Sequence, residues 1–488
     1  MTAGLMMSLF LAAIDGTIVA TAMPAIVGEL QGFGLYPWVA SLYLLVSSAT
    51  VPIYGKWSDI RGRREVLFGG ILLFLLGSVL CGFSQSMGQL IFFRALQGLG
   101  AGAIMPVTQT IIGDIYSYEE RARMQGYFSS VWGISALVGP ALGGFLVTVL
   151  SWRWVFLVNL PVGLLAFFLL LRFYEDKAPR HGRRVDYLGA ALLATGVSSL
   201  MLFLLQGRQW GWTSFPSLFL LALSLVLLFL FVLQERRFPE PLLPVILFTE
   251  RVIWVSNLGG LLMGMLIVAI SFSLPIFMVG ALGHSPALAG TVVASVSIGW
   301  PLFSTISGRL GLRTGFRFTA ILGTLFTALA SLWLYGISLS TSPLYLAAGA
   351  FLMGAGLGLS TTSFIIEIQA VAPPHLRGVA TASQQFVRQV GSALGLALMG
   401  AVLYSLFLSH LDTATLRALG GTQGALSAVD HLLDVAQPQP LPAGIEGSLA
   451  QALLVGTRGV YLFTLAVSLA AFLTVLFFPR RRGNASEG

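Results

Sequence analysis

The segment GKWSDIRGRR, from Gly55 to Arg64, stands between two strongly apolar runs. It combines two glycines, one acid and four bases. Gly55 lets a neighbouring helix approach closely, and Asp59 is suited to accept hydrogen bonds from the positive N-terminal end of another helix. A loop that is basic only for membrane topology does not need the spacing G-x-x-x-D-x-x-G-R-R. We therefore interpret the segment, in which Gly62 and Arg63 complete the pattern, as a latch between two parts of the chain.

The composition of the whole chain places this segment in a membrane protein. Of 488 residues, 56% are hydrophobic and 9% are charged, whereas soluble domains have roughly 25% charged residues. This excludes an ordinary soluble enzyme, a coiled coil and a disordered protein. The net charge of +8 is spread over short loops, so we expect no nucleic-acid partner. The single cysteine, Cys81, provides neither a disulfide framework nor a metal cluster.

Fourteen segments are apolar and long enough to cross a bilayer as helices, which takes about 20 residues. Their expected spans are 4–29, 36–55, 66–84, 89–112, 124–149, 154–172, 187–206, 215–233, 252–280, 287–307, 316–336, 343–366, 379–407 and 457–478. With the N-terminus inside, 21 of the 27 Lys and Arg residues fall in cytoplasmic loops or the C-terminal tail. Four fall outside, and Arg94 and Arg388 fall within helices. This asymmetry fits the positive-inside rule with both termini in the cytoplasm.

Several motifs resemble those of one transporter family. GKWSDIRGRR resembles motif A of the major facilitator superfamily, and a degenerate echo, GRLGLRTGFR at 308–317, indicates a repeat. Four further segments resemble the 14-helix drug:proton antiporters of that superfamily: LAAIDGTIVATAMP (11–24), RALQGLGAGA (94–103, motif B), GISALVGPALGG (133–144, motif C) and SWRWVFLVNLPVG (151–163). The resemblance covers essentially the whole chain and does not fix the substrate.

The resemblance implies an all-α membrane protein with the major facilitator fold, two six-helix bundles plus two inserted helices. The expected divisions are an N-terminal bundle (1–172), a cytoplasmic linker (173–186), the inserted helices (187–233), a second linker (234–251), a C-terminal bundle (252–478) and a cytoplasmic tail (479–488). We expect residues 408–456 to form an extracytoplasmic loop, either a surface excursion or a lid over an outer vestibule.

Asp15 and Arg94 are the candidates for proton coupling. Asp15 lies deep in the first apolar segment, where a charge costs about 2.5–3.5 kcal/mol on translocon scales. It therefore faces a cavity, is paired or is protonated, and a fixed structural ion pair is the alternative to a proton site. Arg94 is a natural partner because a guanidinium stays charged. A bound cationic substrate would compete with the proton for the Asp15 carboxylate.

The remaining candidates fall into three sets. The substrate cavity is predicted to include Tyr43, Gln97, Trp132, Trp300, Gln384, Gln385, Phe386 and Arg388, with cation–π contacts from the aromatic rings; packing or lipid contact is the alternative for each aromatic residue. The conformational motifs comprise Gly55, Asp59, Gly62, Arg63 and Arg64, and the antiporter motif that the resemblance implies, Gly133, Gly139, Pro140, Gly143 and Gly144. We assign the Gly139–Gly144 cluster to a sliding interface between the bundles. Glu367 is the second candidate, after Asp15, for an acid that takes up the proton.

Taken together, these features predict a proton-coupled exporter of lipophilic, often cationic compounds that works by alternating access. A dedicated exporter of one lipid, antibiotic or siderophore-like compound is the alternative within transport, and a membrane enzyme or receptor is the alternative outside it. The sequence has no G-x-x-x-x-G-K-[ST] phosphate loop, so we expect the proton gradient to drive it without a cofactor or metal. We expect a monomer in a bacterial cytoplasmic membrane, with protons, lipids and a small-molecule substrate as partners.

Overall fold

The computed structural model describes residues 1–30, 35–175, 186–239, 241–243, 247, 249–421 and 445–479, which form helices joined by short connections. The first half contains α1 (Thr2–Leu30), α2 (Tyr36–Arg61), α3 (Arg63–Gly82), α4 (Met87–Ile115), α5 (Tyr118–Val149), α6 (Trp154–Leu157) and α7 (Asn159–Phe173). Two helices follow, α8 (Tyr187–Trp210) and α9 (Phe215–Arg237). The second half contains α10 (Arg251–Pro275), the π-helical turn η3 (Ile276–Ala281), α11 (Pro286–Thr314), α12 (Phe316–Tyr335), α13 (Pro343–Val371), the 3-10 turn η4 (Pro374–Leu376), α14 (Arg377–Ser409), α15 (Thr413–Ala418) and α17 (Glu446–Leu476).

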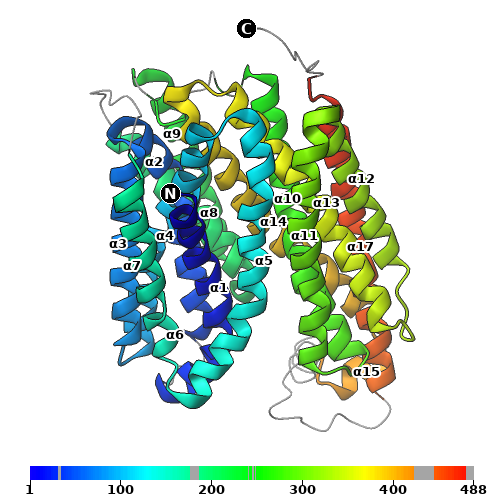
Figure 1. Ribbon diagram of the computed structural model, residues 1–488. Helices are drawn as coiled ribbons and strands as arrows, with labels where there is room; N and C mark the ends of the chain where they lie inside the picture. The colour runs from blue at the N-terminus through cyan, green and yellow to red at the C-terminus, as the bar shows by residue number, and fades with distance from the viewer. Residues whose placement is uncertain are drawn as a thin grey trace.

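The described helices include fourteen that are long and apolar enough to span a membrane, which confirms the expected number. Helices α1 to α7 form one bundle and α10 to α14 with α17 form the other (Figure 1). The bundles meet through α2 against α14 and α5 against α11. Helices α5 and α11 lie close together near one end and diverge towards the other (Figure 1). We call the end where they approach the cytoplasmic end, because the positive-inside rule places its loops there.

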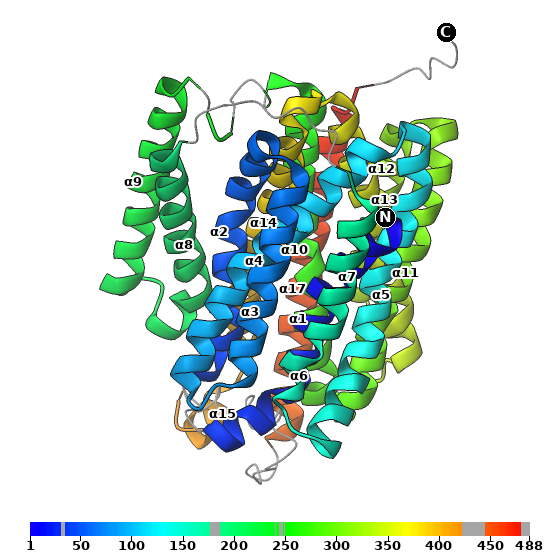
Figure 2. The same cartoon turned by 60° about the vertical axis from the view of Figure 1, so that its left-hand side comes forward.

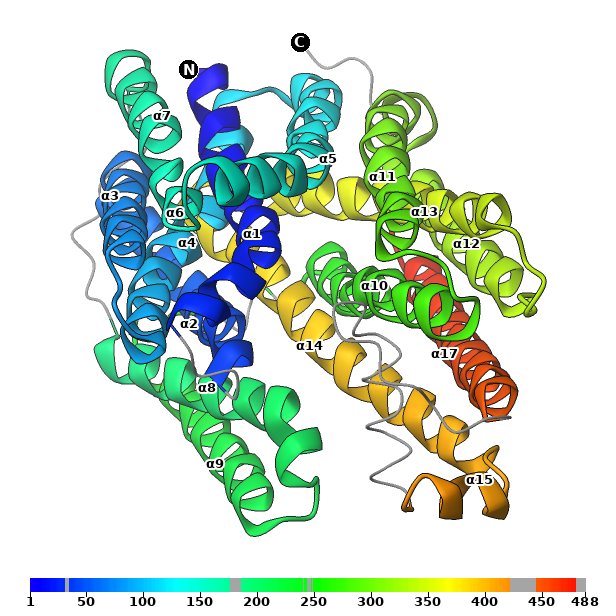
Figure 3. The ribbon, with the colours of Figure 1, turned by 90° about the horizontal axis from the view of Figure 1, so that it is seen from below.

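Helices α8 and α9 pack on each other as a separate pair (Figure 2). Leu193, Val197 and Met201 of α8 join a buried cluster with Leu45 and Ala49 of α2. The pair therefore covers the contact between α2 and α14, on the side of the molecule opposite α5 and α11 (Figure 3).

Small residues allow close packing inside each bundle. A Cβ at Gly100 of α4 would overlap the backbone of Phe74 in α3, and one at Gly356 of α13 would meet Gly323 of α12. Close backbone approach of this kind supplies much of the attraction between helices in lipid, where apolar burial gives little.

In each half of the chain, a single glycine connects two helices where a cytoplasmic loop was expected. Gly62 has φ 104° and separates α2 from α3, and Gly315 has φ 86° and separates α11 from α12. Only glycine adopts such angles without a Cβ penalty. The segment from Gly55 to Arg64 is thus helical on both sides of Gly62 and is not a loop.

One further boundary differs from the expected one, and two spans with the expected bounds are irregular inside. Helix α17 starts at Glu446, eleven residues before the expected 457, because the amphipathic stretch before it continues the helical pattern. The sixth span divides at Val158 into α6 and α7, because Pro161 has no N–H to donate to Leu157. The ninth ends in η3 directly after Pro275. Most of the first linker (176–185), residues 422–444 of the expected outer loop and the tail from 480 lie outside the described residues.

Candidate functional site

A buried acid–base network lies in the middle of the N-terminal bundle. Arg94 of α4 donates from Nη1 to Oδ2 of Asp15 in α1, with 2.7 Å between the two atoms. Oδ1 of Asp15 accepts from Nε2 of Gln97 at 2.8 Å and from Nδ2 of Asn159 at 2.9 Å. Asp15 is 0% exposed and Arg94 2%. The two residues that the sequence suggested as partners therefore form an ion pair that is sealed from solvent.

Further contacts fix the guanidinium of Arg94. Its Nη1 also donates to Oε1 of Gln97 at 2.8 Å, and its Nε donates to the carbonyl of Val39 at 3.4 Å. The ring of Tyr43 lies beneath it, 4.1 Å from Cζ to the ring centroid, a cation–π geometry. Tyr43 and Gln97, predicted to line a substrate cavity, instead hold the Arg94 side chain.

Asn159 is a member of this network that the sequence analysis did not single out. It occupies the first turn of α7 just after the helix break, and it donates to Asp15 and to Oγ of Ser78. An amide in an otherwise apolar segment is the signal that would have found it, because a polar group in hydrocarbon requires a partner.

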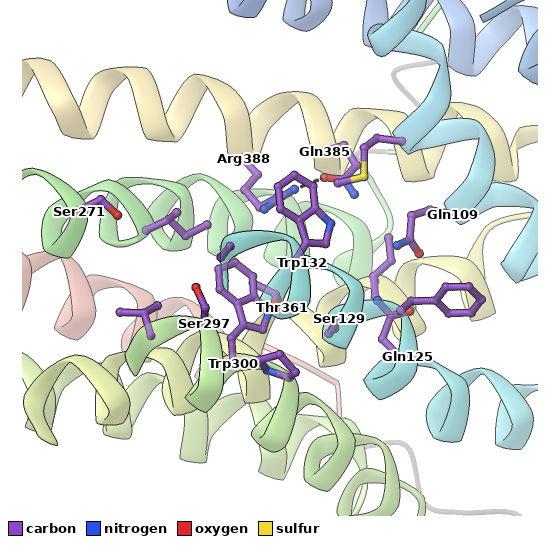
Figure 4. Close-up of a pocket in the computed structure, with 18 of the residues that line it drawn as sticks. Gln109, Gln125, Ser129, Trp132, Ser271, Ser297, Trp300, Thr361, Gln385 and Arg388 are labelled. Carbon is purple, nitrogen blue, oxygen red and sulfur yellow. Dashed lines mark hydrogen bonds between the residues drawn. The ribbon is translucent and has the colours of Figure 1, made fainter. Parts of the chain in front are cut away.

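A cavity of about 270 Å³ lies between the two bundles. Its lining includes Trp132 of α5, Trp300 of α11, and Gln384, Gln385 and Arg388 of α14, five of the residues that were predicted to line a substrate cavity (Figure 4). The lining also includes polar residues that were not predicted, namely Thr17, Gln109, Gln125, Ser129, Ser271, Ser297 and Thr361. They come from six helices, so their convergence depends on how the helices are rotated.

Phe386 lies away from the cavity. It packs against the cluster formed by α2 and α8. Residues 384, 385 and 388 share one face of a helix, and residue 386 falls on nearly the opposite face at 100° per residue. The prediction that Phe386 belongs to the substrate cavity is therefore wrong for this conformation.

The cavity and the acid–base network are separate. Among the described residues that line the cavity there is no carboxylate, and Asp15 is enclosed by Arg94, Gln97 and Asn159. Thr17, two residues further along α1, does reach the cavity. Direct competition between a cationic substrate and a proton for Asp15 is therefore not supported by this arrangement.

At the cytoplasmic end Asp59 joins the bundles. Its Oδ1 accepts from the backbone N–H of Gly378 at 3.0 Å and its Oδ2 from that of Val379 at 2.9 Å. These groups belong to the first turn of α14, so the carboxylate lies at the positive end of that helix. A Cβ at Gly55 would overlap Ala382 of α14, which explains the glycine one turn earlier.

Arg63 and a second acid extend the same contact. Arg63 lies 2.6 Å from Oδ1 of Asp59 and 3.1 Å from Oδ2 of Asp114, and it donates to the carbonyl of Pro374 at 3.2 Å. Asp114, at the end of α4, also pairs with Arg377 of α14 at 2.7 Å. Arg64 turns to α7, donating to the carbonyl of Leu171. Asp114 was not among the predicted site residues, although an acid at the end of an apolar helix is a visible signal.

Further bonds strengthen this closure towards the cavity. Tyr118 of α5 donates to Oε1 of Glu367 in α13 at 2.6 Å, so Glu367 is a buried partner of the other bundle. Gln369 donates to the carbonyl of Gln109 at 2.8 Å. At the wall of the cavity, the hydroxyl oxygens of Ser129 in α5 and Ser304 in α11 are 2.8 Å apart. The bundles are thus held together on the cytoplasmic side of the cavity.

Comparison with known proteins agrees with this architecture. A sequence model of the Major Facilitator Superfamily matches residues 5–396. The chain belongs to the major facilitator superfamily. The multidrug transporter protein MdtP of Bacillus subtilis is 37% identical over 402 residues, covering 82% of this chain and 74% of that protein. Multidrug resistance protein 3 of the same organism is 31% identical, covering 98% and 94%.

Solved structures show the same fold in distant members of the superfamily. The human organic anion transporter MFSD10 superposes with a TM-score of 0.63 at 15% identity, covering 96% of this chain and 98% of that one. The proton:xylose symporter XylE superposes with a TM-score of 0.66 at 12% identity, covering 98% and 94%. The homologues and the fold are those of transporters and not of enzymes.

The glycine cluster from Gly139 to Gly144, which resembles an antiporter motif, packs in a different place from the one expected. Gly139 and Gly143 pack against Thr17 and Thr21 of α1, inside the N-terminal bundle, and a Cβ at Gly144 would meet open space. Helix α5 continues through Pro140. The assignment of the Gly139–Gly144 cluster to a sliding interface between bundles is therefore wrong.

The glycines of α5 that do lie between the bundles are on another face of that helix. A Cβ at Gly133 would lie 2.6 Å from the carbonyl oxygen of Ser297, and one at Gly126 would overlap Thr305. Gly308 of α11 packs in the same way on Ala122. These contacts occur along the part of α5 nearest the cytoplasmic end, and they bring α5 and α11 close enough to close the cavity on that side.

Proposed function

We propose that this chain is a proton-coupled exporter that moves lipophilic small molecules across the membrane by alternating access. The observation that carries the proposal is a largely apolar cavity between two bundles, closed at the cytoplasmic end and separate from a buried Asp15–Arg94 pair. The two Bacillus relatives are named for multidrug transport and multidrug resistance, which supports the same class of activity.

The proton step acts on Asp15. The ionised carboxylate pairs with Arg94, so protonation removes the charge partner of a buried guanidinium and weakens the network. Helix α1 links this event to the cavity, because Thr17 lines the cavity and donates to the carbonyl of Ser135 in α5 at 3.1 Å. A shift of α1 therefore changes the cavity wall without contact between substrate and proton.

The conformational step breaks the cytoplasmic closure. Opening to the cytoplasm requires the Asp59 contact with α14 and the Asp114–Arg377 pair to separate. Because these links lie together at one end of the molecule, they act as one two-state element that substrate and proton can bias. We place the protein in the cytoplasmic membrane as a monomer.

The wall of the cavity favours a range of compounds over one dedicated substrate. Trp132, Trp300 and aliphatic side chains make non-directional contacts. The preference for cations expected from the resemblance has no counter-charge in the described lining, so we propose lipophilic compounds without that preference.

Reconstituted vesicles test the proposal. The purified chain is placed in liposomes with an imposed pH gradient, and a panel of neutral, anionic and cationic lipophilic dyes is followed by fluorescence. We expect gradient-dependent movement of several dyes that a proton uncoupler abolishes. Movement that is unchanged by the uncoupler would exclude proton coupling, and movement of one compound alone would favour a dedicated exporter.

A further inference from the structure

Arg388 is a cation in the cavity without an acidic partner. Its guanidinium donates from Nη2 to Oε1 of Gln385, and no ion pair is formed with it by the described residues. Between Glu250 and Asp412 the sequence has one acid, Glu367, and that carboxylate accepts from Tyr118 at the cytoplasmic closure. The cavity therefore carries a positive charge that its own lining does not balance.

The backbone around Arg388 is held firmly. A Cβ at Gly264 of α10 would overlap the carbonyl oxygen of Arg388. Ser392 donates to the carbonyls of both Gly264 and Arg388, at 3.0 Å and 3.2 Å. Gln385 orients the guanidinium from one turn earlier. A positioned side chain of this kind loses little freedom on binding a ligand.

The chemistry of the remaining donors defines the ligand group that fits. A guanidinium has five N–H donors in a planar fork that matches the two oxygens of a carboxylate or the oxygens of a sulfonate. A cation in the same cavity would be repelled by the like charge of Arg388. Trp132 and Trp300 line the same cavity as Arg388 and offer flat apolar surfaces to a ligand there (Figure 4).

We propose that the cavity binds lipophilic organic anions, with Arg388 receiving the acidic group and Trp132 and Trp300 contacting the apolar body. This assignment names the substrate class of the exporter function proposed above and rests on it. It reverses the cationic preference expected from the sequence.

A matched probe series tests the assignment. Dansylglycine, dansylamide and a dansyl derivative bearing a trimethylammonium group share one ring system and differ in charge. Binding of each to the full chain in lipid nanodiscs is measured by fluorescence anisotropy, with empty nanodiscs subtracted. We expect dansylglycine to bind at least about tenfold more tightly than the cationic probe, since charged hydrogen bonds of this kind contribute factors of roughly ten to a hundred.

Variants of Arg388 separate charge recognition from structure. Arg388→Gln should lower the affinity for dansylglycine by about tenfold or more. It should leave the affinity for dansylamide unchanged and should not lower the affinity for the cationic probe. Arg388→Lys should restore part of the anion affinity. Arg313→Gln, which removes an exposed charge at the end of α11, should change nothing. Equal weakening of all three probes in Arg388→Gln, or tighter binding of the cation than of the anion by the unmodified chain, would overturn the assignment.

Transport of the same probes distinguishes this assignment from the exporter function. If the pH gradient moves the probes but shows no preference for the anion, the assignment of Arg388 fails and the exporter function stands. If the anion binds through Arg388 but the gradient moves none of the probes, proton-coupled export fails and the ligand class stands.

Discussion

The two oxygens of Asp15 accept three hydrogen bonds from three different side chains. The hydrogen bond from Arg94 is charge-assisted on both sides only while the carboxylate is ionised, so protonation weakens this bond. Its protonation is thus coupled to a rearrangement of Arg94, Gln97 or Asn159. In the proposed function, this is the link between one proton and a change in helix packing.

The variant Asp15→Asn should abolish gradient-driven export and also destabilise the protein. Removing one partner of a buried ion pair costs about 3–5 kcal/mol, because Arg94 is left charged and unpaired. The double variant Asp15→Asn/Arg94→Gln removes both charges, so it should recover much of the lost thermal stability without recovering coupling. Thermal denaturation in detergent and vesicle transport measure the two effects.

Controls for this prediction come from the same chain. Asp412→Asn, at the start of α15, should retain transport. Arg94→Lys should retain only part of the transport activity, because lysine lacks the bond to Val39 and the planar contact with Tyr43. Full proton-driven export by Asp15→Asn would contradict the role of this residue.

At the scale of helices, Glu29 ties the outer end of α1 to the connection between α5 and α6. Its carboxylate accepts from Nη1 of Arg153 and, at 2.7 Å, from Nε1 of Trp152. These hydrogen bonds hold the pKa of Glu29 below its ordinary value of 4.5, and the bond from Arg153 has the largest effect. The stabilisation is therefore present above the unfolded-state pKa and is lost as the pH falls through the lowered value.

We expect Glu29→Gln to lower the melting temperature slightly at pH 6–8, with the difference from the unmodified chain closing below about pH 4. The effect is small because Glu29 is half exposed. Melting curves across pH measure it. A difference that grows on acidification would show that the carboxylate does not act through its ionised form.

Asp59 connects two helices of different bundles through the N-terminus of α14. Asp59→Asn has one acceptor oxygen in place of two and no charge, so it weakens the contacts with Gly378, Val379 and Arg63. We expect the population to shift away from the conformation closed at the cytoplasmic end and transport to slow.

Spin labels measure this shift. Cysteines replace Glu119 and Arg313, exposed at the cytoplasmic ends of α5 and α11, in a Cys81→Ser background. The distance distribution between them should move to longer values in Asp59→Asn and stay unchanged in Arg61→Gln, an exposed residue of the same motif. Identical distributions in Asp59→Asn and the parent would argue against a latch.

For the whole molecule, the sequence predicted what is local. Span number follows from apolar runs, and the contact of Asp59 with a helix N-terminus follows from an acid at a fixed spacing from two glycines. The faces of helices were not predictable in this way. Phe386, Gly139 and Gly143 were each assigned to the wrong neighbour, because their neighbours depend on the rotation of α14 and α5 against helices far away in sequence.

The inserted pair α8–α9 makes the two lateral sides of the transporter unequal. Protein covers the junction of α2 with α14, whereas the junction of α5 with α11 lies on the opposite side, away from the pair (Figure 3). Lipid acyl chains therefore press directly on the junction of α5 with α11. At the junction of α2 with α14 they press on the α8–α9 hairpin that covers it. Bilayer thickness and lateral pressure act on the closing motion asymmetrically as a result, and a compound dissolved in the membrane meets a different surface depending on the side from which it arrives.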